Sequence, residues 1–282
     1  MEKNFFLLSS DLQGKVVFVT GAARGLGRAM ALGAAQAGAA VALADVNWDA
    51  LCAADLAREF GPYEHFVQQL DISDLKSCET SIGACLARFG KIDVLINNAG
   101  RGPNFVSASP KSRSLKFWEA DPERWSTLIQ TNVVGTFYMS QVAAKLMIEV
   151  GWGRIINIST SLATMHRPQG SPYGVSKAAI DTQSIIWARD LAGTGVTVNI
   201  LLPGGAADTD FVTPDMRVAA QSGAAILHKP TIMVAPMIWL ASDSSSGFSG
   251  VRLVAAKWDE SKPLGKRIED SIEPAILRGV GT

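Results

Sequence analysis

The sequence is poor in residues that bind metals or form disulfides, with three cysteines and three histidines among 282 residues. Cys52, Cys78 and Cys85 show no C-x-x-C spacing and no histidine pattern beside them. Neither a disulfide framework nor a zinc site is therefore predicted, and a reducing compartment fits the cysteine usage. We expect no bound metal.

The sequence also lacks a net charge and a long apolar run. Its 26 basic and 26 acidic residues cancel, which leaves no electrostatic basis for binding nucleic acid or an anionic membrane. The apolar run 5–8 is too short for a signal peptide, and no stretch approaches the roughly 18 apolar residues of a membrane span. We expect a cytoplasmic protein with no nucleic-acid or membrane partner.

What the sequence does contain is a regular alternation of short apolar runs with helical patterns. Strands are expected at 15–20, 41–44, 66–70, 92–96, 154–159, 196–202 and 251–255, and helices at 25–38, 47–60, 73–89, 122–150, 172–191 and 230–241. Alternation of this kind predicts an α/β fold, a doubly wound parallel sheet of about seven strands with helices on both faces. No repeat or linker composition appears, so residues 1–282 are interpreted as one domain.

A glycine-rich turn joins the first expected strand to the first expected helix. Gly21, Gly25 and Gly27 follow Thr20 in this turn. Glycine allows the backbone to approach a pyrophosphate closely, and the helix N-terminus offers free N–H groups and a positive dipole end. The turn therefore predicts dinucleotide binding, with Arg24 and Leu26 as further candidate contacts.

The second expected strand ends in Asp45, 20 residues after Gly25. A carboxylate at this place accepts hydrogen bonds from adenosine ribose hydroxyls and repels a 2′-phosphate. Arg24 favours the opposite preference because it could pair with that phosphate. We expect NAD(H) rather than NADP(H), since the repulsion from Asp45 is direct whereas Arg24 is free to turn to solvent.

Tyr173 and Lys177 stand four residues apart, on one face of a helix. Ser171 is expected to cap this helix and Pro172 to be its first residue. A lysine charge at about 4 Å would favour the phenolate by roughly 4 kcal/mol. The pair therefore predicts a tyrosine whose pKa is lowered from about 10 toward neutral, where it works as a general acid/base.

Taken together, these motifs resemble those of the short-chain dehydrogenases/reductases. The pattern comprises Thr20-Gly21-x-x-x-Gly25-x-Gly27, Asn97-Asn98-Ala99-Gly100, Tyr173-x-x-x-Lys177 and Pro203-Gly204, in the order typical of that family. The resemblance covers about 12–256 and implies a Rossmann-like dinucleotide-binding and catalytic core, a nicotinamide cofactor and commonly a homotetramer or homodimer. Substrate loops are expected at 101–121 and 205–230, and the tail 257–282 is assigned no structure.

The resemblance also implies roles for individual residues. Tyr173 would be the acid/base, Lys177 would lower its pKa and hold the nicotinamide ribose, and Asn132 would support a water relay to that lysine. Asp71 would meet the adenine. The remaining candidate cofactor contacts are Ile72, Asn98, Ala99, Gly100, Pro203, Gly204 and Thr209.

Three positions depart from the family pattern. Thr160 stands thirteen residues before Tyr173, where a serine is usual, with Ser161 as the second candidate for that role. A threonine hydroxyl still donates to a carbonyl oxygen, although its methyl group restricts the rotamer. Thr209 is one place later than expected, and Ala255-Ala256-Lys257 replaces the usual Asp-Gly-Gly.

The sequence thus predicts an NAD(H)-dependent oxidoreductase that interconverts a secondary alcohol and a ketone. An NADPH-dependent 3-oxoacyl reductase is the alternative within the enzyme class, with Lys111, Arg113 and Lys116 facing an acidic carrier. A nucleotide-binding regulatory protein without turnover is the alternative outside that class. His166 and Arg167 lie where a substrate would pass, but a lone loop histidine is more often solvated.

Overall fold

The protein is described by a computed structural model over residues 11–52, 54–106, 116–212 and 214–273. Within these ranges an eight-stranded sheet runs in the order β10-β9-β6-β5-β4-β1-β2-β3. All neighbours are parallel except the antiparallel pair β9 and β10. The strands are β1 (Val16–Thr20), β2 (Ala40–Asp45), β3 (His65–Gln69), β4 (Val94–Asn97), β5 (Gly153–Ile158), β6 (Val196–Leu202), β9 (Arg252–Val254) and β10 (Ile272–Glu273).

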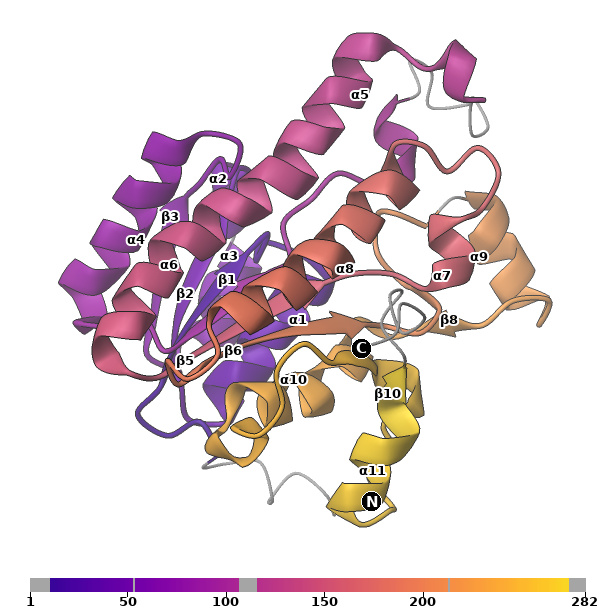
Figure 1. Ribbon diagram of the computed structural model, residues 1–282. Helices are drawn as coiled ribbons and strands as arrows, with labels where there is room; N and C mark the ends of the chain where they lie inside the picture. The colour runs from indigo at the N-terminus through magenta and orange to yellow at the C-terminus, as the bar shows by residue number, and fades with distance from the viewer. Residues whose placement is uncertain (1–10, 53, 107–115, 213, 274–282) are drawn as a thin grey trace.

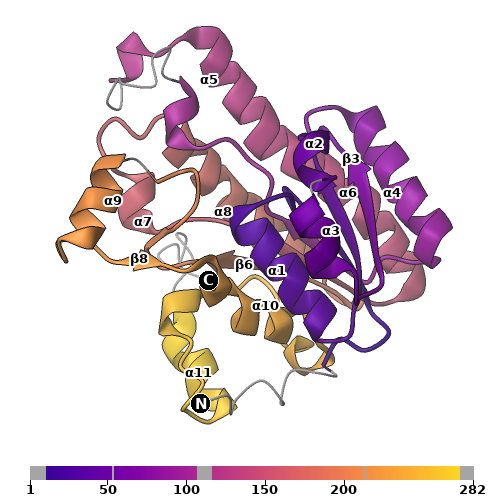
Figure 2. The same ribbon diagram turned by 180° about the vertical axis from the view of Figure 1, so that it is seen from behind.

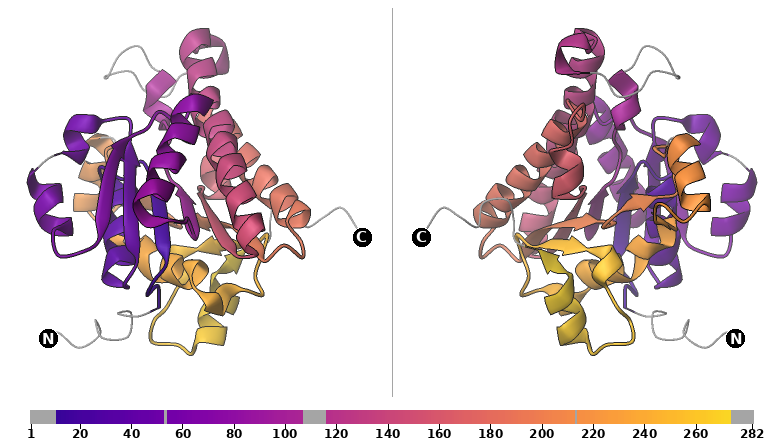
Figure 3. Two further views of the ribbon diagram at one scale, coloured as in Figure 1. Left: turned by 90° about the vertical axis from the view of Figure 1, so that its left-hand side faces the viewer. Right: turned by 90° about the vertical axis from the view of Figure 1, so that its right-hand side faces the viewer.

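Helices cover both faces of the sheet. One face carries α4 (Leu75–Phe89), α5 (Pro122–Ile129), α6 (Thr136–Val150) and α8 (Tyr173–Asp190), which lie in front in Figure 1. The other carries α1 (Gly25–Gln36), α2 (Trp48–Leu51), α3 (Ala54–Phe60), η4 (Pro230–Met233) and α10 (Val234–Ala241), seen from behind in Figure 2. Figure 3 shows the two layers edge-on. The predicted doubly wound α/β fold is confirmed.

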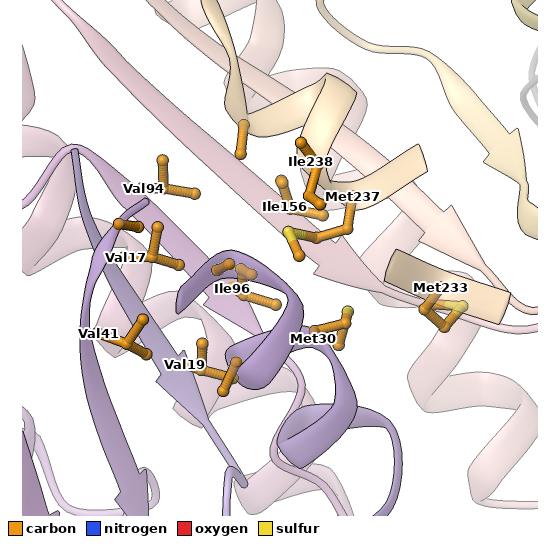
Figure 4. Close-up of a cluster of buried hydrophobic side chains, with 14 of the residues drawn as sticks. Val17, Val19, Met30, Val41, Val94, Ile96, Ile156, Met233, Met237 and Ile238 are labelled. Atoms are coloured by element: carbon orange, nitrogen blue, oxygen red, sulfur yellow. The ribbon is translucent and has the colours of Figure 1, made fainter. Parts of the chain in front are cut away.

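The strands read as continuously apolar because both of their faces are buried. Val17 and Val19 of β1 pack toward α1 and α10 with Met30 and Met237, as Figure 4 shows. The alternate side chains of the same strand, Phe18 among them, pack under α4 and α6. Successive side chains of a strand point to opposite faces, so a strand between two helix layers needs apolar residues at every position.

Short elements gather beyond the carboxyl ends of the strands (Figure 1). They are η1 (Pro103–Val106), η2 (Phe117–Glu119), α7 (Leu162–Met165), α9 (Pro214–Gln221) and a two-stranded sheet of β7 (Ala206–Ala207) and β8 (Leu227–His228). The short helix η6 (Ala255–Lys257) follows directly on the carboxyl end of β9, and η5 (Asp243–Ser245) follows α10.

Two expected helices differ from the structure. The single helix predicted from Asn47 to Phe60 is divided into α2 and α3, with the Asn47 side chain accepting from the Ala50 N–H as a cap. The long helix predicted from 122 to about 150 contains a π-helical segment, η3 (Gln130–Gly135), between α5 and α6. Such segments are frequent at functional sites.

The Tyr173 helix begins one residue later than expected. Pro172 is its N-cap residue and makes no side-chain cap bond, while the Ser171 hydroxyl accepts a hydrogen bond from the Trp125 indole N–H at 3.2 Å. The expected Ser171 cap is therefore wrong, because a partner from α5 takes its hydroxyl.

The tail from residue 257 is also more ordered than predicted. This tail contains helix α11 (Leu264–Ser271) and strand β10, which is the eighth strand of the sheet. Ion pairs to α11, such as that of its Asp270 with the preceding Lys262 at 2.8 Å, stabilise a helix that carries little apolar surface. Polar composition suggested an unstructured segment, but docking against β9 decided the conformation.

Candidate active site

The strand order reverses between β1 and β4, and ligands of doubly wound sheets bind at such a switch point. A cavity of about 1120 Å³ lies there. Its lining includes eleven of the predicted cofactor contacts: Gly21, Arg24, Gly25, Leu26, Asp45, Asp71, Ile72, Asn98, Ala99, Gly100 and Thr209. Residues from four strand ends, far apart in the sequence, thus share one cavity.

The glycine loop has the shape that a pyrophosphate needs. A Cβ on Gly27 would stand 2.1 Å from the Gly21 carbonyl oxygen, and Gly21 and Gly25 have φ angles of +66° and +58°. Arg24, the N-cap residue of α1, supplies no side-chain cap hydrogen bond. The first-turn N–H groups of α1 are therefore available to an anion in the cavity, so the residues present fit a dinucleotide phosphate.

Two side chains hold this loop in place. Asn98 donates from its amide to the carbonyl oxygens of Thr20 and Gly21, both at 3.0 Å. The Thr20 hydroxyl accepts from the N–H groups of Asn98 and Ala99, each at 3.0 Å. The structure thus gives Asn98 a bracing contact with the loop in addition to its place in the cavity wall.

Both carboxylates at the adenosine end are fixed by N–H groups of their own surroundings. Asp45 accepts from the N–H groups of Ala23 at 3.1 Å and Asn47 at 3.0 Å. Asp71 accepts from the N–H of Ser73 at 2.9 Å and from its hydroxyl at 2.6 Å. Each oxygen keeps a lone pair for a ribose hydroxyl or an adenine amine.

Each arginine that lines the cavity has a partner. Arg24 pairs with Asp210, and Arg217 pairs with Asp208. Arg28 contacts Glu59 at 2.7 Å and Asp55 at 3.0 Å, and Arg101 donates to the Thr131 hydroxyl at 3.1 Å. Arg24 therefore points to Asp210 of the segment before α9 in this structure.

Tyr173, Lys177 and Thr160 lie together beside this cavity, at the carboxyl end of β5. The Thr160 side chain lies beside the Tyr173 hydroxyl and favours its charged form. The Lys177 ammonium lies 5.9 Å from the centre of the Tyr173 ring and donates to the Ile158 carbonyl oxygen at 2.8 Å. Ser161 is engaged elsewhere, because it caps α7 by accepting from the Thr164 N–H at 3.2 Å.

Burial changes the expected proton affinities of this group. It raises the pKa of Tyr173 to about 12, and the neighbouring Thr160 side chain offsets only part of the rise. Burial also lowers the pKa of Lys177 to about 8, with Asp181 opposing the shift. The predicted low pKa of Tyr173 is therefore wrong for this structure, because desolvation of the phenolate is the largest influence on it.

Asn132 sits in the π-helical segment η3, fully buried. Its amide donates to the Arg101 carbonyl oxygen at 3.1 Å and to the Ser176 hydroxyl at 3.0 Å, and its oxygen accepts from the Arg101 N–H at 2.7 Å. Asn132 thus connects the loop after β4 to the first turn of α8, next to Lys177.

Other predicted residues lie outside the cavity wall. Gly27, Pro203, Gly204, Tyr173 and Lys177 do not line it. A Cβ on Gly204 would approach the Val254 side chain to 2.6 Å, which places Gly204 against β9. His166 and Arg167 are exposed, and Lys111 and Arg113 fall outside the described residues. Thr209 contacts the glycine loop, 3.1 Å from a Cβ built on Gly25.

Comparison with known proteins agrees with this geometry. The family model described as short chain dehydrogenase matches residues 15–217. The chain belongs to the short-chain dehydrogenase family. It is therefore an NAD(P)-dependent oxidoreductase that acts on CH–OH groups, and its substrate is a small molecule. Within the described residues no helix combines the length and apolarity that a membrane crossing requires.

Among curated relatives of this short-chain dehydrogenase is D-threitol dehydrogenase of Mycolicibacterium smegmatis, 32% identical over 86% of this chain and 92% of its own length. A 3-oxoacyl-acyl-carrier-protein reductase of Thermotoga maritima is 31% identical over 85% and 95%. Among solved structures, a putative gluconate dehydrogenase from Agrobacterium tumefaciens has a TM-score of 0.73 at 29% identity, covering 85% of this chain and 93% of its own. Levodione reductase has a TM-score of 0.74 at 25% identity, over 85% and 95%.

The structure adds buried charges that the sequence analysis missed. Asp181 lies one turn after Lys177 in α8, and Arg252 lies in the short strand β9; both are fully buried. A charged residue inside an apolar strand pattern was the available signal, as in Val251-Arg252-Leu253-Val254. Charged residues are rarely fully buried unless they are paired.

Proposed function

We propose that this short-chain dehydrogenase is an NAD(H)-dependent enzyme that interconverts a secondary alcohol and a ketone. The observation that carries the proposal is the grouping of the Thr160 side chain with the Tyr173 hydroxyl and the buried Lys177, together with the cavity that the glycine loop lines. A hydroxyl pair at this place can address one carbonyl oxygen from two directions. One member transfers the proton and the other stabilises the developing charge.

The protonation state of Tyr173 suits carbonyl reduction. With a pKa raised to about 12, Tyr173 carries its proton at neutral pH and can give it to the substrate oxygen. The nicotinamide, when bound, supplies or accepts the hydride at the substrate carbon. In oxidation Tyr173 must first lose its proton, which requires positive charge nearby to counter its burial; Lys177 supplies part of that charge.

Lys177 and Asn132 form the support beneath Tyr173. The Lys177 ammonium has three donor hydrogens and uses one on the Ile158 carbonyl oxygen, which leaves others for the nicotinamide ribose. Asn132 holds the Ser176 hydroxyl at 3.0 Å, and that hydroxyl donates to the Tyr173 carbonyl oxygen at 2.7 Å. This chain fixes the first turn of α8, from which both Tyr173 and Lys177 project.

The charges around the adenosine end support NAD over NADP. A 2′-phosphate beside Asp45 would meet a carboxylate, and the nearby Arg28 is already neutralised by Asp55 and Glu59. Arg24 is held by Asp210. A 2′-phosphate would therefore meet repulsion from Asp45, while Arg24 and Arg28 are already paired with carboxylates.

The test is turnover by Tyr173→Phe, measured with a panel of polyols, cyclic ketones and 3-oxoacyl thioesters. The variant should lose at least about 10²-fold in turnover because the proton donor is gone. NADH affinity, measured by fluorescence titration, should stay within about two-fold, since the phenyl ring keeps its packing. Unchanged turnover would reject the mechanism. Tight NADH binding by the wild type without turnover on any substrate would favour a regulatory protein.

A 3-oxoacyl reductase activity with NADPH is the second candidate, because a relative of that name is 31% identical over 85% of the chain. Comparing NADPH-dependent turnover of 3-oxoacyl thioesters with NADH-dependent turnover of simple ketones separates the two candidates.

We further propose a cytoplasmic homo-oligomer formed through α6 and α8. Phe137, Ile148 and Ile186 on these helices are 37%, 44% and 49% exposed, and the rings of Phe137 and Trp187 lie 6.4 Å apart, which places both helices on one surface. Large exposed apolar side chains gathered on one surface mark an interaction site. Light scattering of the wild type and of Ile148→Lys tests it, and a monomeric wild type would reject it.

A further inference from the structure

Arg252 links three elements around the proposed active site. Its side chain is fully buried. The Nε donates to the Asp181 carboxylate of α8 at 2.9 Å, one terminal nitrogen contacts the Thr160 carbonyl oxygen, and the other contacts the Glu273 carboxylate of β10. All three nitrogens of the guanidinium therefore have partners, and each partner belongs to a different segment.

These contacts belong to a row of alternating charges. It runs from Lys177 through Asp181, Arg252 and Glu273 to Lys257, which contacts Glu273 at 2.9 Å. Lys177 is at the reacting centre and Lys257 is half exposed. The Ser159 hydroxyl also faces the Asp181 carboxylate and favours its charged form. The row thus joins the reacting centre to the C-terminal segment.

Stability of the fold does not by itself explain why charged side chains are buried in such a row. A buried ion pair replaced by apolar side chains of similar volume is often neutral or more stable. Here the Arg252 contacts end at particular atoms: the backbone of Thr160, whose side chain lies beside the Tyr173 hydroxyl, and a carboxylate one turn after Lys177. A guanidinium fork fixes directions as well as charge, because its donors lie in one plane.

We propose that Arg252 is a positioning residue for this active site, and that Glu273 on β10 is the third partner that fixes its guanidinium. Arg252 holds the Thr160 backbone so that the Thr160 hydroxyl faces Tyr173, and it orients Asp181 behind Lys177. Strand β10 adds no residue to the cavity wall. Its pairing with β9 nevertheless places Glu273 against Arg252 and so sets the geometry of Tyr173, Lys177 and Thr160. This proposal rests on the proposed function, since it assumes that Tyr173, Lys177 and Thr160 act together.

The test compares Arg252→Lys and Glu273→Gln with Asp270→Asn in the full-length protein. Lysine keeps the charge of Arg252, but its single nitrogen cannot serve three partners. Glutamine removes the charge of a side chain that is 29% exposed. Asp270 is a matched control, an acid on the adjoining helix α11 that pairs with Lys262 and Lys266 and makes no contact with Arg252.

Turnover of both test variants should fall by about three- to thirty-fold, because small misplacements of reacting groups are costly. NADH affinity should stay within about two-fold, so the loss lies in kcat rather than in cofactor binding. Asp270→Asn should match the wild type. Asp181→Asn, if it folds, should move the pH at which alcohol oxidation is half-maximal upward, because Lys177 loses the carboxylate that favours its charged form.

Wild-type turnover in both Arg252→Lys and Glu273→Gln would overturn the proposal, even if the melting temperature falls. Equal losses in Asp270→Asn and Glu273→Gln would also overturn it, since docking of the tail rather than the charge row would then matter. Retained activity in Tyr173→Phe would instead overturn the proposed function. The two failures are therefore distinguishable.

Discussion

The Thr160 side chain lies beside the Tyr173 hydroxyl and lowers a pKa that burial raises. Thr160 is placed for this contact by the end of β5, where the N–H of Ser159 donates to the Leu201 carbonyl oxygen at 3.0 Å, and by Arg252 on its own carbonyl. Ser161, one residue further, faces α7 instead. The placement of these neighbouring hydroxyls leads to the first prediction.

Thr160→Ala should lower turnover by about 10²- to 10³-fold, the usual effect of removing one donor at a developing oxyanion. Thr160→Ser should stay within about ten-fold because it keeps the hydroxyl. Ser161→Ala is the matched control and should cost about 1 kcal/mol of stability through loss of the cap, with turnover little changed. Steady-state kinetics together with thermal melts check all three variants. A severe kinetic defect in Ser161→Ala would mean that Thr160 was the wrong assignment.

Asp45→Asn should shift cofactor preference toward NADP. The change removes a charge that repels a 2′-phosphate and weakens hydrogen bonds to the ribose, each worth about 1–3 kcal/mol when a charged group is involved. The ratio of kcat/KM for NADPH to that for NADH should rise by about 10- to 100-fold. Asp49→Asn, in the first turn of α2 and outside the cavity lining, is the control. A ratio that stays constant would remove the ribose role of Asp45.

The Arg24–Asp210 pair bridges the cavity between the glycine loop and the segment before α9. Both side chains are more than half exposed, so the pair is worth at most about 1 kcal/mol. Asp210→Asn should therefore speed both association and release of NADH by up to about five-fold, because the bridge opens more often. Stopped-flow fluorescence measures both rates. If NADH binds to and leaves Asp210→Asn at the same rates as wild type and the remote variant Asp270→Asn, the bridge is no barrier to the cofactor.

Two buried thiols should make the protein less stable in alkali. Burial raises the pKa of Cys85 to about 12, against 9 in the unfolded chain, and the pKa of Cys78 likewise, with help from Asp74 and Asp71. The folded state then holds protons that the unfolded state has lost. Their contribution is fully present below pH 9 and is lost as the pH rises through about 12.

Urea unfolding between pH 8 and 10.5 should thus show a falling free energy of unfolding. Cys85→Ala should reduce that slope by up to about 1.4 kcal/mol per pH unit, the value for one proton. Cys52→Ala, at an exposed thiol, serves as control. An identical slope in Cys85→Ala and wild type would contradict the raised thiol pKa.

Local patterns were sufficient for most of the fold. The strand ends at Thr20, Asp45 and Asn97 and the helix cap at Asn47 follow from side-chain periodicity and capping chemistry, which act over a few residues. For the same reason the glycine loop could be located from spacing alone. The family motifs in turn predicted which strand ends would share a cavity.

Non-local contacts decided the rest. The high pKa of Tyr173, the partner of Arg24, the ordering of β10 and the row through Arg252 all depend on groups distant in sequence. Sequence alone determined the order of strands and helices and the residue types gathered at the strand ends, because those depend on short-range periodicity. Only the tertiary structure decided which of these groups are desolvated and which charges meet, because burial and ion pairing depend on the whole packed chain.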